Sequence, residues 1–156
     1  MTKILELGDS VPDIKLPSST GKDVSLADFK GKKVVLYFYP KDDTPGCTTE
    51  ACDFRDALSN YKDLNVEIVG VSKDPTSSHE KFIEKYQLPF VLLSDPDLKL
   101  MEAFGVWKEK TMYGRTALGV SRSTFLIDEN GILVKAWLNV KATGHVAKVL
   151  EEVKKM

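Results

Sequence analysis

The sequence predicts an α/β protein in which a central mixed β-sheet is flanked by helices. Apolar strand patterns alternate with helical patterns through the middle of the chain, a strong hairpin turn follows, and an amphipathic helix comes last. The chain has 156 residues, of which 42% are hydrophobic and 29% charged. We therefore expect one domain, residues 1–156, with a substantial hydrophobic core.

Strand and helix patterns alternate in the first half of the chain. Residues 33–39 are dense in β-branched and aromatic side chains and predict a buried strand that stops at Pro40. Apolar side chains then recur at helical spacing from about residue 47 to residue 60. A second buried strand is predicted at 66–72, and a second helix at 76–87.

The same alternation continues toward a C-terminal hairpin. Residues 90–93 predict a short strand, and residues 95–104 fit a helix that ends at a glycine. The sequence Asp-Glu-Asn-Gly lies between two strand patterns at 123–127 and 132–138, and such a turn is typical of an antiparallel hairpin. Residues 146–153 predict the last helix.

Two further segments complete the expected fold. The turn-rich residues 7–29 predict a small N-terminal β-hairpin. Residues 105–120, which include Trp107, Met112 and Tyr113, are predicted to be irregular, either a functional lid or a plain surface loop. The order of strands and helices fits the thioredoxin fold.

The charge balance bears on partners and location. Lys and Arg number 22 and Asp and Glu number 23, which gives a formal net charge of −1. A near-neutral chain has no general attraction to nucleic acid or to anionic membranes, so we expect neither as a partner. The longest apolar run is far shorter than a spanning helix, and the N-terminus does not resemble a signal peptide. We therefore expect a cytoplasmic protein.

The two cysteines, Cys47 and Cys52, are separated by four residues. Two cysteines are too few for a disulfide-rich secreted scaffold, and in a reducing compartment a close pair is more often catalytic, redox-sensing or metal-binding. A zinc site needs about four ligands. The only histidines, His79 and His145, have no ligand-like spacing to the cysteines, so we expect no metal. We expect His145 at the surface and His79 outside any relay with Cys47.

Cys47 lies where a helix is predicted to begin. Thr44 followed by Pro45 matches an N-cap residue followed by proline at the first helical position. Cys47 is then the third helical residue, where unpaired N–H groups and the helix dipole favour thiolate over thiol. The Thr44 hydroxyl can either cap the Cys47 N–H or donate to its sulfur. The alternative for Cys47 is a small buried hydrophobic residue.

Cys52 is too far along the same helix to pair with Cys47 in place. Residues i and i+5 of an intact helix have Cα atoms roughly 8.6 Å apart. This separation exceeds the approximately 7 Å limit for a disulfide. A bond between the two sulfurs therefore requires the first helical turns to unwind. The alternative for Cys52 is an ordinary half-buried cysteine.

The loop and helix start resemble a known family. Pro40-x-x-x-Thr44-x-x-Cys47 is similar to the active-site pattern of the peroxiredoxins. Residues 46–52, Gly-Cys-Thr-Thr-Glu-Ala-Cys, resemble the bacterioferritin comigratory protein, or peroxiredoxin Q, subfamily. The similarity extends over nearly the whole chain and includes residues 70–74, 78–82, 88–95 and 122–128.

The resemblance implies a thioredoxin-like peroxiredoxin that acts as a thiol-dependent peroxidase. Cys47 would be the peroxidatic cysteine, which attacks hydrogen peroxide or an alkyl hydroperoxide and becomes a sulfenic acid. Cys52 would be the resolving cysteine, which forms an intramolecular disulfide with Cys47. Thioredoxin or a similar dithiol protein would then reduce the disulfide. No cofactor is implied, because sulfur carries the electrons.

The resemblance also gives roles to the residues around the sulfur. Thr44 would hydrogen-bond the thiolate and the peroxide, and Pro40 would shield the site from water. Arg122 would donate to the sulfur and to a peroxide oxygen, and Glu50 would orient Arg122. Without the motif, Arg122 is a solvated arginine at a strand edge and Glu50 a charge at a helix start. A resolving cysteine in the same chain favours a monomer.

Two other functions remain open from the sequence. One is a thioredoxin-like protein disulfide oxidoreductase, against which the missing Cys-x-x-Cys pair argues. The other is a non-catalytic redox sensor that binds partners once Cys47 is oxidised. Reduction of insulin disulfides without consumption of peroxide would favour the first, and stoichiometric oxidation without turnover would favour the second.

Overall fold

The structure is a computed structural model that describes residues 4–112 and 114–156. Its centre is a five-stranded sheet whose strands lie in the order β5 (Val91–Ser94), β4 (Val66–Ser72), β3 (Lys33–Phe38), β8 (Ser123–Ile127) and β9 (Leu133–Trp137). β3, β4 and β5 are parallel, whereas β8 and β9 run antiparallel to their neighbours. The predicted mixed sheet is confirmed.

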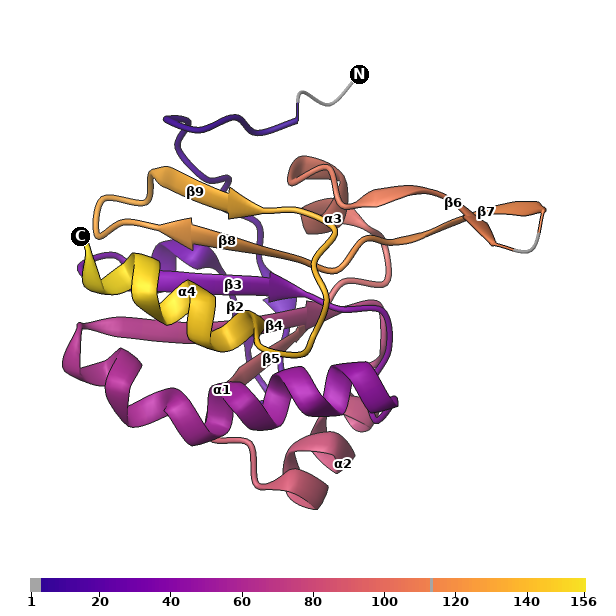
Figure 1. Cartoon of the computed structure of the whole chain (residues 1–156), viewed down its shortest axis with the longest axis horizontal. Coiled ribbons are helices and arrows are strands. Elements are labelled where there is room, and N and C mark those ends of the chain that lie inside the picture. The colour runs from indigo at the N-terminus through magenta and orange to yellow at the C-terminus, as the bar shows by residue number, and fades with distance from the viewer. Residues whose placement is uncertain (1–3, 113) are drawn as a thin grey trace.

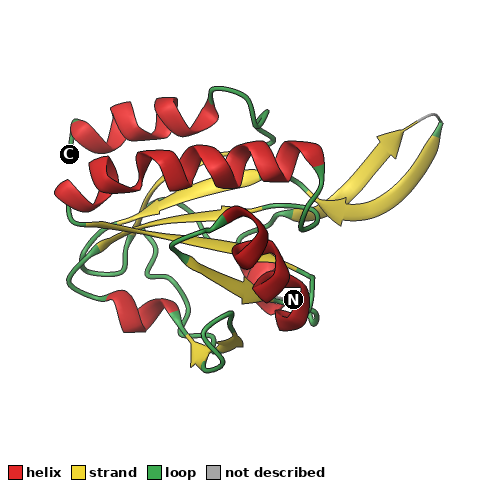
Figure 2. Cartoon of the chain, turned by 90° about the horizontal axis from the view of Figure 1, so that it is seen from below, coloured by secondary structure: helices red, strands yellow, loops and turns green. Residues whose placement is uncertain are grey.

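Helices cover both faces of this sheet (Figures 1 and 2). α1 (Pro45–Asp63), α2 (Thr76–Tyr86) and α4 (His145–Lys154) contribute buried side chains to one hydrophobic core. α3 (Lys99–Ala103) and the 3-10 helix η1 (Leu26–Phe29) contribute to the core on the opposite face. Figure 2 shows α1 and α4 side by side above the sheet.

β3 lies at the centre of the sheet and supplies both cores. Val35 and Tyr37 belong to the core beneath α1, whereas Val34, Leu36 and Phe38 belong to the other core. Successive side chains of a strand point to opposite faces, so a strand covered on both sides is apolar throughout. This is why residues 33–39 read as a continuous apolar run and not as an alternating one. The strand leads directly into the loop before α1.

The predicted N-terminal hairpin is confirmed as a short one. β1 (Leu16–Pro17) and β2 (Asp23–Val24) form an antiparallel two-stranded sheet. Leu16 and Leu26 of η1 are buried in the core opposite α1. The segment thus closes one side of the fold and lies away from the helix that carries the cysteines.

The prediction that residues 105–120 are irregular is wrong. They form an antiparallel hairpin of β6 (Trp107–Met112) and β7 (Arg115–Val120), which projects from the body of the protein (Figures 1 and 2). Most of β7 is exposed. Neither the β6 sequence nor the β7 sequence shows the apolar alternation that marks a half-buried strand. At its base, Lys73 Nζ lies 4.8 Å from the ring centre of Trp107. Tyr113 lies outside the described residues.

The helix predicted at 95–104 is shorter than expected. α3 begins at Lys99, because Leu98 adopts a left-handed conformation with φ of 62°. Asp95 remains outside the helix and accepts hydrogen bonds from the backbone N–H groups of Leu100 and Met101, at 3.0 and 2.9 Å. An aspartate that caps from several residues upstream is not distinguishable by sequence from one in the first turn.

Candidate active site

Cys47 occupies the position that the sequence predicts. Thr44 is the N-cap of α1, Pro45 is the first helical residue, and Cys47 is the third. The Cys47 side chain is buried, with 1% of its surface exposed, and belongs to the core between α1 and the sheet. The first N–H groups of a helix have no partner within it, so they present positive charge near this sulfur.

The Thr44 hydroxyl makes neither of the two contacts considered from the sequence. It donates to the backbone carbonyl of Lys41 at 2.9 Å and makes no side-chain cap to α1. The Thr44 carbonyl accepts the first helical hydrogen bond, from the Thr48 N–H at 2.8 Å. The side chain therefore stabilises the turn that leads into the helix. Its proposed contact with a peroxide stays a prediction.

Arg122 joins the site from a distant part of the chain. It lies between β7 and β8, and its Nη2 donates to Cys47 Sγ at 3.2 Å. Its Nη1 donates to Glu50 Oε1 at 2.8 Å. The guanidinium thus lies between the sulfur and a carboxylate that is one helical turn further along α1. β8 pairs with β3 in the sheet, and this pairing brings Arg122 to the start of α1.

Glu50 is fully buried, and its charge state depends strongly on its surroundings. Burial raises the pKa of Glu50 to about 7, even though the neighbouring Arg122 acts in the opposite direction. Burial acts to lower the pKa of Arg122, but the charges of Glu50 and Cys47 more than offset this effect and raise it. The guanidinium therefore stays charged, whereas Glu50 gains or loses a proton near neutral pH.

This burial gives a test by pH. A carboxyl whose pKa is higher in the folded than in the unfolded state stabilises the fold at pH values below its pKa in the unfolded state. That contribution is lost as the pH rises through about 7. We expect the unfolding free energy of the parent, minus that of Glu50→Gln, to fall between pH 5 and pH 8 by an amount on the order of 3 kcal/mol. Urea unfolding of both proteins at each pH measures it, and a constant difference would contradict the buried titration.

Cys52 and Pro40 complete the set of predicted site residues. Cys52 lies on the same unbroken helix, is half-buried, and is a free thiol like Cys47. Pro40 lies at the surface between β3 and the loop. The structure brings Arg122 into contact with both Cys47 and Glu50.

Sequence reasoning underestimated both histidines. His145 is buried, not at the surface, and its Nε2 lies 2.7 Å from the Thr124 hydroxyl. Burial, with Lys148 and Arg122 adding to it, lowers the pKa of His145 to about 4. His79 is fully buried and lies 2.7 Å from the Asp42 carboxylate, in the loop before α1. The pairing of Asp42 with the start of α2 gave no periodic signal in the sequence.

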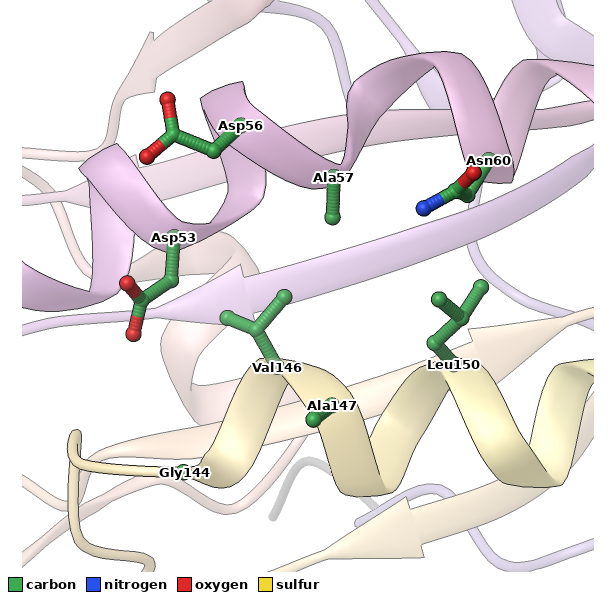
Figure 3. A pocket seen from close by; sticks show the side chains of 8 residues that line it. All are labelled: Asp53, Asp56, Ala57, Asn60, Gly144, Val146, Ala147 and Leu150. Carbon is green, nitrogen blue, oxygen red and sulfur yellow. The ribbon is translucent and has the colours of Figure 1, made fainter.

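No metal cluster is evident: within residues 4–112 and 114–156, no group of three His, Cys, Asp or Glu side chains is placed to hold an ion. In the same residues, no helix is both long and apolar enough to cross a bilayer. A groove of about 380 Å³ lies between α1 and α4 (Figure 3), lined by residues that include Asp53, Asp56 and Leu150. It contains none of the predicted site residues.

Fold and site together define a thioredoxin-like protein with a cysteine-centred redox site. A family model described as the AhpC/TSA family matches residues 7–136. The chain is 53% identical over 152 residues to peroxiredoxin Bcp of Bacillus subtilis, and the match covers 97% of each protein. It is 45% identical over 151 residues to peroxiredoxin Bcp of Xanthomonas campestris, covering 97% of this chain and 94% of that one.

Solved structures agree with these relatives. The bacterioferritin comigratory protein of Xanthomonas campestris, whose structures address its alkyl peroxide reduction activity, superimposes with a TM-score of 0.90 at 44% identity over 97% of both chains. A cysteine-to-serine mutant of Xylella fastidiosa PrxQ gives a TM-score of 0.92 at 39% identity over 98% of both. The chain therefore belongs to the AhpC/TSA family, among the Bcp peroxiredoxins, and is a thiol-dependent peroxidase.

Proposed function

We propose that the protein reduces hydrogen peroxide and alkyl hydroperoxides through Cys47, with Cys52 as the resolving cysteine. The observation that carries this proposal is the contact of Arg122 Nη2 with Cys47 Sγ at 3.2 Å. A guanidinium beside the sulfur supplies positive charge and N–H donors at the point where charge develops in the reaction. The family supplies the reaction class, and this geometry supports the choice of residues.

In the first step the Cys47 thiolate attacks one peroxide oxygen. The sulfur–oxygen bond forms as the oxygen–oxygen bond breaks, and the departing oxygen takes a proton and leaves as water or alcohol. Cys47 is left as a sulfenic acid. A guanidinium has five N–H groups in a rigid fork, so the group that contacts the sulfur can also donate to a peroxide oxygen. Charge that develops on the departing oxygen is thereby stabilised.

Glu50 supports this step by fixing the orientation of the guanidinium. Its hydrogen bond with Arg122 Nη1, at 2.8 Å, holds one arm of the fork, so that the other arm points at the sulfur. Gly46 contributes space, because a Cβ at this position would lie 3.1 Å from Arg122 Nη2. The start of α1 and the guanidinium therefore pack at a distance that admits no larger residue without movement.

In the second step the thiol of Cys52 attacks the sulfenic sulfur, a disulfide forms, and water leaves. Both cysteines lie on α1, which is continuous from Pro45 to Asp63. In an intact helix their Cα atoms are roughly 8.6 Å apart, beyond the reach of a disulfide. We therefore propose that the first turns of α1 unwind for this step and reform when the disulfide is reduced.

Replacement of the resolving cysteine tests this step. In Cys52→Ser we expect one rapid oxidation of Cys47 and then no turnover with a dithiol protein. The serine hydroxyl cannot condense with a sulfenic acid to form a disulfide. Stopped-flow kinetics of peroxide loss measures both phases, and a small external thiol should restore turnover. Normal turnover of the variant with thioredoxin would show that Cys52 is not the resolving residue.

The reductant and the setting complete the proposal. A disulfide within one chain is a substrate for thioredoxin or a similar dithiol protein, by thiol–disulfide exchange. Such reductants act in a reducing compartment, and we propose the cytoplasm. Since both cysteines belong to one chain, a monomer suffices. Peroxide consumption with thioredoxin, in parallel with an insulin-reduction assay, tests the function: insulin reduction without peroxide consumption would contradict it.

A further inference from the structure

A buried cluster of polar groups surrounds the Asp42 carboxylate, in the loop that precedes α1. The Asp42 side chain is 3% exposed. Its Oδ1 accepts a hydrogen bond from the Tyr39 hydroxyl at 2.5 Å. Its Oδ2 accepts from the Ser78 hydroxyl at 2.8 Å and lies 2.7 Å from His79 Nδ1. The two carboxylate oxygens are thus bound from both the end of β3 and the start of α2.

His79 faces an acceptor on each side of its ring. Its side chain is 0% exposed, and its Nε2 lies 2.8 Å from the carbonyl oxygen of Leu93. A carbonyl oxygen can only accept, so Nε2 carries a proton. On the other side of the ring, Nδ1 lies 2.7 Å from Asp42 Oδ2, so the two side chains are joined by a hydrogen bond that is shielded from water. Burying polar groups costs desolvation that offsets much of their attraction, so overall stability alone is a weak reason for this pair.

The loop is attached to α2 at more than this one point. The backbone N–H of Asp42 donates to Asp74 Oδ2, in the turn just before α2, at 2.8 Å. Asp43, with φ of 56°, accepts from Lys85 and from the Tyr86 hydroxyl near the end of α2, both at 2.8 Å. The contacts of Asp43 are exposed and contribute little. The buried contacts of Asp42 are therefore the ones that fix the loop.

The position of this loop decides where α1 begins. Two residues separate Asp42 from Pro45, the first residue of the helix, and Cys47 follows within the first turn. Gly46 packs so closely that an added Cβ would lie 3.1 Å from Arg122 Nη2. A small shift of the loop thus changes the distance between the sulfur and the guanidinium. Misplacement of reacting groups by about 1 Å can lower a rate about 100-fold.

We propose that Asp42, held by His79, is a positioning residue for peroxide reduction. It fixes the loop against α2, so that α1 begins where Cys47 Sγ meets Arg122. This inference rests on the proposed function, because it assigns Asp42 and His79 a role in the reaction of Cys47. Neither side chain touches the sulfur, so both act through the placement of the helix start.

The test compares Asp42→Asn and His79→Gln with the parent protein. We expect the second-order rate of Cys47 with hydrogen peroxide to fall about 10- to 100-fold in each variant. The double variant should lose no more than either single one, because the two residues act as a pair. Alkylation of Cys47 by iodoacetamide does not need the sulfur to be aligned with Arg122, so its rate should not fall in parallel.

Asp95→Asn is the matched control. Asp95 is also a fully buried aspartate, but its side chain caps α3 on the opposite face of the sheet. We expect it to lower the unfolding free energy and to leave the peroxide rate within about twofold of the parent, because its side chain bonds the backbone of Leu100 and Met101 and not the loop before α1. Each unfolding free energy is measured by urea denaturation.

Two outcomes separate this inference from the proposed function. If the Asp42 and His79 variants lose stability but react with peroxide as fast as the parent, the pair is structural and the inference is wrong. A parallel fall in the rates with peroxide and iodoacetamide would also overturn it. If the parent itself leaves peroxide unreduced, the proposed function fails.

Discussion

Cys47→Ser abolishes peroxide reduction, and the variant consumes peroxide no faster than the uncatalysed background. A serine hydroxyl is not ionised near neutral pH and cannot attack the oxygen–oxygen bond as a thiolate does. The replacement is close in size, and the buried hydroxyl can still accept from Arg122, so we expect a stability change of about 1 kcal/mol. Steady-state peroxide consumption with a dithiol reductant measures the loss.

Cys52→Ser is the matched control for this variant. It makes the same atomic change on the same helix, at a half-buried position. We expect it to keep the first oxidation, whereas Cys47→Ser loses every step. If Cys47→Ser reduced peroxide at the parent rate, the nucleophile would have to be another residue and the account would be wrong.

Arg122→Ala has the next largest expected effect. It removes the N–H group that lies 3.2 Å from the sulfur. Loss of one preorganised donor to developing charge typically costs about 10²- to 10³-fold in rate. Glu50 then loses its partner, and because its pKa already lies near 7, it takes up a proton and avoids a buried charge. We therefore expect the first step to slow far more than the fold is destabilised.

Two controls separate the catalytic from the structural role of Arg122. Arg55 lies on α1 itself, pairs with exposed Asp56 and donates to the Tyr86 carbonyl. Arg55→Ala should leave the peroxide rate unchanged. Arg122→Lys keeps the charge but not the planar fork, so it should restore only part of the rate. A large loss of stability in Arg122→Ala with an unchanged peroxide rate would show that Arg122 is structural.

The strands and helices of the core could be predicted because their signals are local. Continuous apolar runs mark β3 and β4, and helical spacing of apolar residues marks α1, α2 and α4. The β6–β7 hairpin could not be predicted, because its two strands, Trp-Lys-Glu-Lys-Thr-Met and Arg-Thr-Ala-Leu-Gly-Val, lack an alternating apolar pattern. The late start of α3 depends on the left-handed Leu98, which propensity does not foresee.

The site was predictable only in part, because some of its contacts join distant parts of the chain and leave no local signal in the sequence. The Thr44–Pro45–Cys47 start of α1 follows from local rules of helix capping. The contact of Arg122 with Cys47 and Glu50 depends on the pairing of β8 with β3, and residue chemistry alone would have left Arg122 at a solvated strand edge. The burial of His79 and His145 depends on packing between elements, so it carried no local pattern.

Mass analysis of the protein after one equivalent of hydrogen peroxide tests the central claim most directly, with rapid quenching and separate detection of the peptides that carry the two sulfurs. We expect one added oxygen on Cys47 at the earliest times, followed by loss of that oxygen as a Cys47–Cys52 disulfide appears. Oxygen found first on Cys52 or on a methionine, with Cys47 still a free thiol, would contradict the account.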